Sequence, residues 1–348
     1  MRDQRTQERG RRAADTRSGA TRVSAEELIE LRREGARIRL APPSVAAAPL
    51  AGPYLSTTRG RGMEFDEVRP YQPGDEIRNI DWHVTARTGR AHSKLFSEER
   101  ERPVLIVLDM AESMHFGTRK RFKSVAAARA AAVIAWGAAD AGDRVGGVVT
   151  NVGGGLFPPR RRRRHLHHLF TRFAQAVGTA DSASGSDSPS KENAKTELSA
   201  VKQHTGGLAD GLRRLRCLAE PGSKIFVISD FYETGDEIRG HLRALARCCD
   251  VTCIRVYDAL EQVPPPAGRY RFADGRGAHC VVDASRAWRD AYAEQIDARR
   301  SRVEEMCRRY RMSLVELRAD QEPAEALSFI AATGPRGNRR PRAHGRAA

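Results

Sequence analysis

Two aspartates stand at the ends of apolar runs: Asp109 directly follows Val104–Leu108, and Asp230 follows Ile225–Ile228 after a single serine, Ser229. Short continuous runs rich in Val and Ile are typical of strands buried on both faces of a parallel sheet. Open α/β sheets hold their ligands at the carboxyl ends of such strands, so neighbouring strands would bring both carboxylates to one edge. Ser113 follows Asp109 closely, and Thr205 precedes a predicted helix. Carboxylate and hydroxyl oxygens suit a hard cation, so these four residues are candidate ligands for Mg²⁺.

The same residues leave several kinds of function open. Asp109 and Asp230 with Mg²⁺ could serve a phosphoesterase or nuclease, although no His or Lys is obviously placed beside them. Gly153-Gly154-Gly155 lacks the Lys and Ser or Thr that complete a phosphate-binding loop, which argues against a nucleotide-binding enzyme. Strand alternation predicts that Ser229 points away from Asp230 and the site. The leading hypothesis is a noncatalytic interaction protein, not an enzyme, whose sheet edge works with Mg²⁺ or with no cofactor.

The predicted elements that position these residues alternate between strand and helix. Apolar runs predict strands at 103–109, 143–150, 224–230, 251–257 and 313–317. Helical periodicity predicts helices at 120–141, 165–177, 208–218, 236–247, 285–310 and 324–331. A short edge hairpin is expected at 153–158, and a second hairpin at 270–282. This order predicts an α/β fold of the doubly wound type, with a mostly parallel sheet and helices on both faces.

Residues 59–82 form the densest motif of the chain, and turn residues within it predict a small β-rich module ahead of the sheet. We expect apolar residues there, among them Ile77 and Trp82, to form its core. The polar residues suit either ion pairs that fix the module or a surface for a protein partner; the candidates are Glu64, Asp66, Arg69, Asp75, Arg78, Asp81 and Trp82. Upstream, Ser24 and Glu27 have the spacing of a capping box, which predicts a helix start.

The net charge of +16 is concentrated in three segments. The first 24 residues, the last 15 residues and the run Arg160–Arg164 together supply 14 of these charges. Such blocks are usually solvated or disordered, so we expect no specific nucleic-acid partner. Residues 178–199 contain almost no large apolar residue and predict a flexible insertion. No apolar run approaches the ~20 residues of a membrane span and no signal peptide is evident, so we expect a cytoplasmic protein. The six cysteines lack paired spacing, so we expect them to be reduced thiols.

Four motifs carry a resemblance to a known family. They read R-G-R-G-M-E-F-D-E-V-R-P-Y-Q-P-G-D-E-I-R-N-I-D-W, V-L-I-V-L-D-M-A-E-S-M-H-F-G, G-D-R-V-G and V-I-S-D-F. Between about Ser24 and Ala331 the chain resembles the von Willebrand factor A-like family known as domain-of-unknown-function number fifty-eight. The resemblance implies a von Willebrand A-like domain at 103–332, preceded by the helix and small module at 23–102. The termini, 1–22 and 333–348, are then a disordered basic arm and tail.

The resemblance also implies a site and a partner. Domains of the von Willebrand A type often carry a metal-ion-dependent adhesion site, in which Asp109, Ser113 and Asp230 match ligand positions. Ser113 matches the second Ser of the Asp-x-Ser-x-Ser loop, whereas Ala111 stands at the position of the first Ser. Thr205 lies one residue before the expected Thr position, so the site is degenerate. The implied partner is a MoxR-type AAA+ ATPase, with which the protein would act in the assembly or activation of other proteins. The client protein is not implied.

Overall fold

The computed structural model describes residues 20–38, 63–72, 77–98, 103–150, 155–178, 207–273 and 279–328. Thr205, Gly153 and Gly154 lie outside these residues, as do the predicted insertion beyond Gly178, the basic tail and the basic arm up to residue 19. The chain divides into two compact units. One comprises Met1–Ala48 and Arg102–Ala348, and the other comprises Pro49–Glu101.

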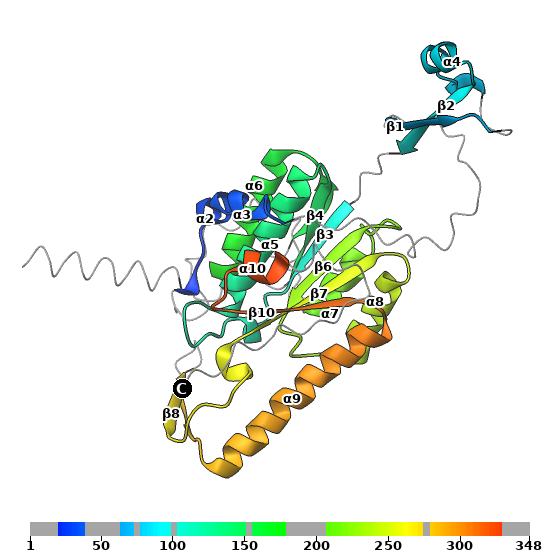
Figure 1. Cartoon of the computed structure of the whole chain (residues 1–348). Coiled ribbons are helices and arrows are strands. Elements are labelled where there is room, and N and C mark those ends of the chain that lie inside the picture. Colours follow the sequence, from blue (N-terminus) through cyan, green and yellow to red (C-terminus); the bar gives the residue numbers. More distant parts are fainter. Residues whose placement is uncertain are drawn as a thin grey trace, which may run out of the picture. The chain divides into compact units, whose positions relative to one another are not determined.

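The larger unit contains a six-stranded, mostly parallel sheet with the strand order β10-β7-β6-β3-β4-β5 (Figure 1). The strands are β3 (Pro103–Leu108), β4 (Arg144–Val149), β5 (Leu156–Arg160), β6 (Lys224–Ser229), β7 (Asp250–Tyr257) and β10 (Ser313–Arg318). Only the edge strand β5 runs antiparallel to its neighbour within this sheet. Because β3 pairs directly with β6, Leu108 lies opposite Ile228 and the two strands end side by side. A separate hairpin pairs β8 (Arg269–Ala273) with β9 (His279–Asp283).

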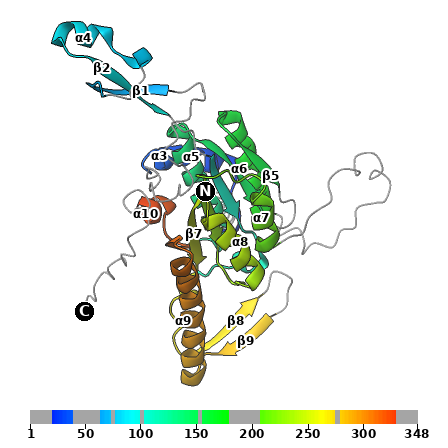
Figure 2. The same cartoon turned by 90° about the vertical axis from the view of Figure 1, so that its right-hand side faces the viewer.

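Helices cover both faces of the sheet, so the predicted mixed α/β fold is confirmed (Figure 2). The helices α5 (Lys123–Asp140), α6 (Arg163–Gly178) and α10 (Pro323–Leu327) share a core with Val104 and Ile106 of β3. The helices α7 (Leu208–Leu215), α8 (Asp236–Ala246) and α9 (Arg286–Arg309) share the opposite core with Leu105 and Val107. Alternate residues of β3 thus serve opposite cores, which explains why its apolar run is uninterrupted.

The N-terminal helices α2 (Ala25–Glu30) and α3 (Arg32–Gly35) pack within the larger unit. The predicted capping box of Ser24 and Glu27 is present. The Trp136 indole of α5 donates a hydrogen bond to the Leu28 carbonyl over 3.1 Å, and a Cβ atom on Gly35 would lie 2.4 Å from that of Trp136. The sequence analysis grouped the N-terminal helix with the small module at 23–102, whereas the structure places α2 and α3 in the larger unit. Gly35 makes this possible, because a residue without a side chain lets α3 approach α5 closely.

The smaller unit pairs β1 (Met63–Pro70) with β2 (His92–Glu98) and carries α4 (Trp82–Thr88) between them. The Asp81 carboxylate begins α4 by accepting hydrogen bonds from the backbone N–H groups of His83 and Val84. Ile77 and Trp82 are 67% and 66% exposed, so the expectation that they form a core is wrong. A unit of this size has little interior in which to enclose them. The side chains of Glu64, Asp66 and Asp75 lie outside the described part, whereas Arg78 is exposed and Arg69 half-buried.

Candidate functional site

Asp109 joins the ends of three adjacent strands. Its side chain is 3% exposed, and its backbone N–H donates to the Ile228 carbonyl of β6. The carboxylate accepts hydrogen bonds from the Ser229 hydroxyl over 2.6 Å, the Thr150 hydroxyl over 2.9 Å and the Ala111 backbone N–H over 3.2 Å. Each carboxylate oxygen therefore has a protein donor.

The orientation of Ser229 corrects the expectation that it points away from the site. Leu108 and Ile228 are partners in the β3–β6 register, so the next residues, Asp109 and Ser229, face one another. Side chains at the same level of neighbouring strands share a face. Ser229 and Asp230 do point to opposite faces of the sheet, as strand alternation predicts. Ser229, however, points to the same face as Asp109.

The burial of Asp109 affects its protonation. Burial raises the pKa of Asp109, and the negative charge of Asp230 raises this pKa further. Hydrogen bonds from Ser229, Thr150 and the Ala111 backbone act in the opposite direction, because they stabilise the carboxylate form. The net effect is a raised pKa, which makes ionised Asp109 less stable in the folded chain than in water.

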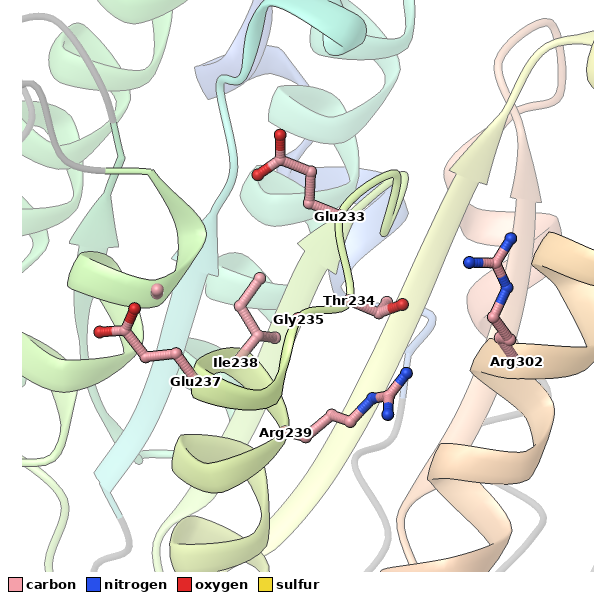
Figure 3. Close-up of a pocket in the computed structure, with 8 residues that line it drawn as sticks. Glu233, Thr234, Gly235, Glu237, Ile238, Arg239 and Arg302 are labelled. Atoms are coloured by element: carbon pink, nitrogen blue, oxygen red, sulfur yellow. The ribbon is translucent and has the colours of Figure 1, made fainter.

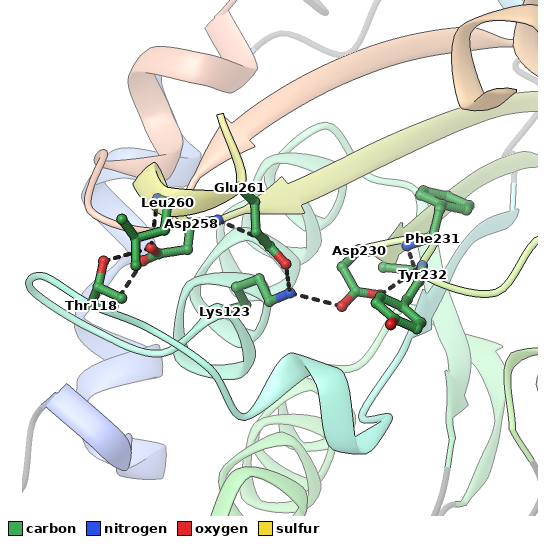
Figure 4. A network of polar contacts seen from close by, with 9 residues as sticks. Thr118, Lys123, Asp230, Phe231, Tyr232, Asp258, Leu260 and Glu261 are labelled. Carbon is green, nitrogen blue, oxygen red and sulfur yellow. Dashed lines mark hydrogen bonds and ion pairs between the residues drawn. The ribbon is translucent and has the colours of Figure 1, made fainter. Parts of the chain in front are cut away.

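Lys123 supplies a buried cation at the second strand end (Figure 4). It is the first residue of α5, and its side chain is 1% exposed. Its ammonium nitrogen lies 2.8 Å from an Asp230 carboxylate oxygen and 2.7 Å from one of Glu261. A positive charge in the first turn of a helix is unfavourable, because the helix N-terminus carries a partial positive charge. The two carboxylates, and not the helix, therefore stabilise the Lys123 ammonium in this position.

A chain of polar contacts extends from this ammonium to two further loops (Figure 4). The other Glu261 oxygen accepts a hydrogen bond from the Asp258 backbone N–H at the end of β7. The Asp258 carboxylate accepts from the Thr118 backbone N–H and hydroxyl over 2.9 and 2.5 Å, and from the Leu260 N–H over 3.0 Å. The segments after β3, β6 and β7 are thus tied together through charged and polar groups.

The residues at this edge do not fit the predicted Mg²⁺ site. Both carboxylate oxygens of Asp109 already accept hydrogen bonds from hydroxyl or amide donors. One oxygen of Asp230 faces the Lys123 ammonium, and the other accepts from the Tyr232 N–H. Ser113 lies in a short 3₁₀ helix, Glu112–Met114, and no hydrogen bond among the described residues links it to either aspartate. Nor does the described part of the chain contain three His, Cys, Asp or Glu side chains grouped to hold a metal ion.

Sequence reasoning missed Lys123, Glu261 and Thr150, each of which contacts a predicted aspartate or its partner. Lys123 follows a cluster of charged residues before α5, and lysines in such segments are usually exposed, so the sequence provided little reason to expect a buried side chain. One signal was present: Lys123 begins a helix whose next charged residue is Arg129 and whose intervening residues are all apolar or small. A lone lysine at the start of so apolar a helix indicates a buried partner.

Immediately beyond Asp230 the chain adopts a strained conformation that exposes an aromatic ring. Phe231 has a φ of 51°, in the left-handed region that bulky residues rarely adopt, and its side chain is buried. Tyr232 is 55% exposed, and the Arg299 guanidinium of α9 lies 4.1 Å from the centre of its ring. Backbone strain of this kind persists where surrounding contacts hold it, and it is frequent at functional sites.

An open hollow of about 480 Å³ lies beside this loop (Figure 3). Its lining includes Thr234 and Gly235 of the loop, Arg239 of α8 and Arg302 of α9. The Thr234 side chain points to the side of the loop on which the guanidinium groups of Arg239 and Arg302 lie (Figure 3). The hollow is bordered by acidic as well as basic groups, since Glu233 and Glu237 also contribute to its lining.

The fold and the site together define an α/β domain whose strand-end carboxylates are satisfied by protein donors and by a buried lysine. The chain belongs to the family described as Protein of unknown function DUF58, whose model matches residues 67–302. Proteins named as uncharacterized from Mycobacterium bovis and Mycobacterium tuberculosis are each 30% identical over 286 residues, covering 81% of this chain and 83% of the relative.

Two solved structures show weak overall similarity. An aerotolerance-related membrane protein from Bacteroides fragilis, carrying multiple mutations to serines, has 16% identity and a TM-score of 0.35, covering 66% of this chain and 96% of its own. An uncharacterized membrane spanning protein from Vibrio fischeri has 15% identity and a TM-score of 0.17, with the same coverages. None of the helices described for the present chain combines the length and apolar character needed to cross a membrane.

Proposed function

We propose that this chain is a noncatalytic protein-interaction module whose larger unit is a von Willebrand A-like domain. The observation that carries the proposal is the position of Lys123, whose ammonium lies between Asp230 and Glu261 at the strand-end edge. An adhesion-type site uses a divalent cation at such an edge. Here the Lys123 ammonium lies against both carboxylates in the place of that cation, so the proposed module works without a metal cofactor.

The lysine network holds a surface for the partner. Asp230 is fixed by Lys123 and by the Tyr232 N–H, which sets the direction of the strained loop that follows. That loop presents the Tyr232 ring with the Arg299 guanidinium against it. Tyrosine and arginine are enriched among the residues that dominate binding energy at protein interfaces. Tyr232 and Arg299 are therefore our candidates for the centre of the contact.

The proposed partner is a MoxR-type AAA+ ATPase in the cytoplasm, and the joint role is the assembly or activation of other proteins. This part of the proposal rests on the family resemblance of the sequence motifs. The smaller unit adds support for a role in binding, because Ile77 and Trp82 expose large apolar side chains. Large apolar side chains that a small unit leaves exposed are candidates for contact with a partner.

A Mg²⁺-dependent phosphoesterase or nuclease that uses Asp109 and Asp230 is the alternative, and the contacts of both residues argue against it. A metal would have to displace the hydroxyl donors of Asp109 or compete with the ammonium beside Asp230. The burial of Asp109 further disfavours its ionised, metal-binding form. Hydrolysis of phosphoesters that requires Mg²⁺ and disappears in Asp109→Asn would support this alternative over the interaction module.

The interaction is tested by crosslinking and affinity capture from native cytosol, followed by binding measurements with the purified pair. We expect a AAA+ ATPase of the MoxR type to be recovered, and Tyr232→Ala to weaken its affinity at least tenfold, as at an interface hot spot. Arg308→Ala is the matched control, because Arg308 is an exposed residue of α9 that pairs only with Glu305 among the described residues. Failure to recover such an ATPase under crosslinking would contradict the proposal.

A further inference from the structure

The loop between β6 and α8 places a threonine near arginines of two different helices. Thr234 is half-buried and lies two residues before the start of α8. Its side chain points to the side of the loop on which the guanidinium groups of Arg239 and Arg302 lie (Figure 3). All three residues line the hollow described above. One hydroxyl group and two positive charges therefore share one side of this hollow.

The two arginines have little compensation from acids of the chain. Arg302 donates from its Nε to the Ala298 carbonyl over 3.2 Å and forms no ion pair with an acid among the described residues. Arg239 reaches Asp236 only over 3.6 Å, and the Asp236 side chain is fully exposed. An exposed pair of this kind contributes little to stability. Both guanidinium groups can therefore accept an anion at small cost.

The other acids of the hollow lie on its opposite side. The carboxylates of Glu233 and Glu237 point away from both guanidinium groups (Figure 3), and Glu237 lies 3.8 Å from His241 of its own helix. An extended polyanion laid across the hollow would meet these carboxylates as well as the arginines. A single anionic group attached to Thr234 would meet the arginines alone. The arrangement thus favours a small anion carried by the loop over a nucleic acid or a lipid surface.

The Thr234 hydroxyl is free to carry such an anion. It makes no hydrogen bond with a described residue, whereas the hydroxyls of Ser229 and Thr150 donate to Asp109. Its backbone lies outside helix and strand, and the flanking residues Glu233 and Gly235 are exposed. Surface loops of this kind are accessible to modifying enzymes. A phosphate placed opposite arginines gains charge-assisted hydrogen bonds that order a loop.

We propose that Thr234 is a phosphorylation site whose phosphate binds between Arg239 and Arg302. A protein kinase supplies the phosphoryl group from ATP. The Thr234 oxygen bonds to the γ-phosphorus, the bond from that phosphorus to the β,γ-bridging oxygen breaks, ADP leaves, and the hydroxyl proton passes to a base of the kinase. The product carries a charge of about −1.5 to −2 at pH 7 and three acceptor oxygens, which match the planar guanidinium forks.

Bound in this way, the phosphate ties the β6–α8 loop to both α8 and α9. This inference is independent of the proposed function. Only its consequence for Tyr232, which lies in the same loop, rests on that function.

A ³¹P NMR titration of the full chain with phosphothreonine installed at position 234 tests these contacts. A phosphate without such contacts has a second pKa of about 6. In the folded chain we expect about a tenfold shift toward the dianion, which lowers this pKa to about 5, because nearby cations favour the more charged form. In urea, where the helices no longer hold the arginines in place, the pKa should return to about 6.

Two variants show whether the arginine pair causes the shift. Arg239→Gln/Arg302→Gln should reverse most of it, since the pair supplies the facing charge. Arg308→Gln removes an exposed arginine of the same helix that pairs with Glu305, and should leave the shift unchanged. A phosphate that titrates near pH 6 in the folded chain would overturn the proposal, as would a shift that survives loss of the arginine pair.

Mass spectrometry of the protein isolated from its native cells tests whether the site is used. Trypsin releases Thr234 in the peptide Ile225–Arg239, which also contains Ser229 and Tyr232. We expect phosphate on Thr234 and none on Ser229, because Ser229 is buried and bonded to Asp109. Recovery of this peptide without phosphate in both growing and stationary cells would overturn the proposal. Phosphate on Tyr232 in place of Thr234 would overturn it as well.

Discussion

Replacement of Lys123 by Met is the sharpest test of the strand-end network. Methionine has a similar length and fills the space of the lysine stem, so the change removes the ammonium without leaving a large cavity. Asp230 and Glu261 then face one another without the cation that lies 2.8 and 2.7 Å from them. Two carboxylates at this edge remain, and each keeps one local backbone donor: the Tyr232 N–H for Asp230 and the Asp258 N–H for Glu261.

The expected cost follows from the burial of the three side chains. Removal of one partner from a buried ion pair lowers the free energy of unfolding by about 3–5 kcal/mol. Glu261 retains some exposure and can turn toward water, which favours the lower end, about 3 kcal/mol. For a domain of this size, that loss corresponds to a decrease in Tm of roughly 6–12 °C.

Urea and thermal unfolding at pH 7 measure this loss, with Lys120→Met as the matched control. Lys120 is exposed in the loop before α5, so its replacement should change the free energy of unfolding by less than about 0.5 kcal/mol. The double variant Lys123→Met/Asp230→Asn should be more stable than Lys123→Met alone, because it removes the unpaired charge while the amide oxygen still accepts from Tyr232.

Two results would refute this reasoning. Lys123→Met with parental stability would show that the ammonium does not hold the two carboxylates. A double variant no more stable than the single variant would show that the loss arises from packing and not from an uncompensated charge. Either result would also remove the main support for a lysine in the role of the metal.

Three further predictions concern the same domain. Asp109 has a raised pKa in the folded chain, so the need to ionise it lowers the free energy of unfolding as pH rises above about 4. Asp109→Asn lacks this group and should therefore lose less free energy of unfolding between pH 4 and 7 than the parent does. The same pH dependence for variant and parent in urea titrations would contradict this prediction. Millimolar Mg²⁺ or EDTA should leave the Tm of the parent unchanged within about 1 °C, whereas stabilisation by several degrees would indicate an occupied metal site. Arg311 follows α9 with a φ of 57°, so Arg311→Gly should raise the free energy of unfolding by about 0.5 kcal/mol, and unchanged or lower stability in urea would count against the strain.

Much of the fold follows from local patterns in the sequence. The strand predicted at 103–109 is apolar without interruption up to Leu108, and β3 covers Pro103–Leu108 with every residue buried. The capping spacing of Ser24 and Glu27 predicts the start of α2 in the same way. These predictions succeed because strand burial and helix capping depend on residues only a few positions apart.

Features that depend on distant contacts were not predictable in this way. The sequence does not reveal that α2 and α3 pack on α5, because that contact relies on Gly35 approaching Trp136. Nor does it reveal that Trp82 is exposed, since an aromatic residue at the start of a helix can face a core or solvent. In each case the deciding neighbours lie far away in the chain.

The site shows the same division. The sequence alone determines that Asp109 and Asp230 end two buried strands, because one apolar run stops at Asp109 and the other stops one residue before Asp230. The tertiary structure alone decides what faces them. Thr150 and Lys123 lie 41 and 107 residues from the aspartates they contact, and only the β3–β6 register places Ser229 opposite Asp109. A carboxylate at a strand end can bind a metal or a lysine, and packing determines which cation reaches it.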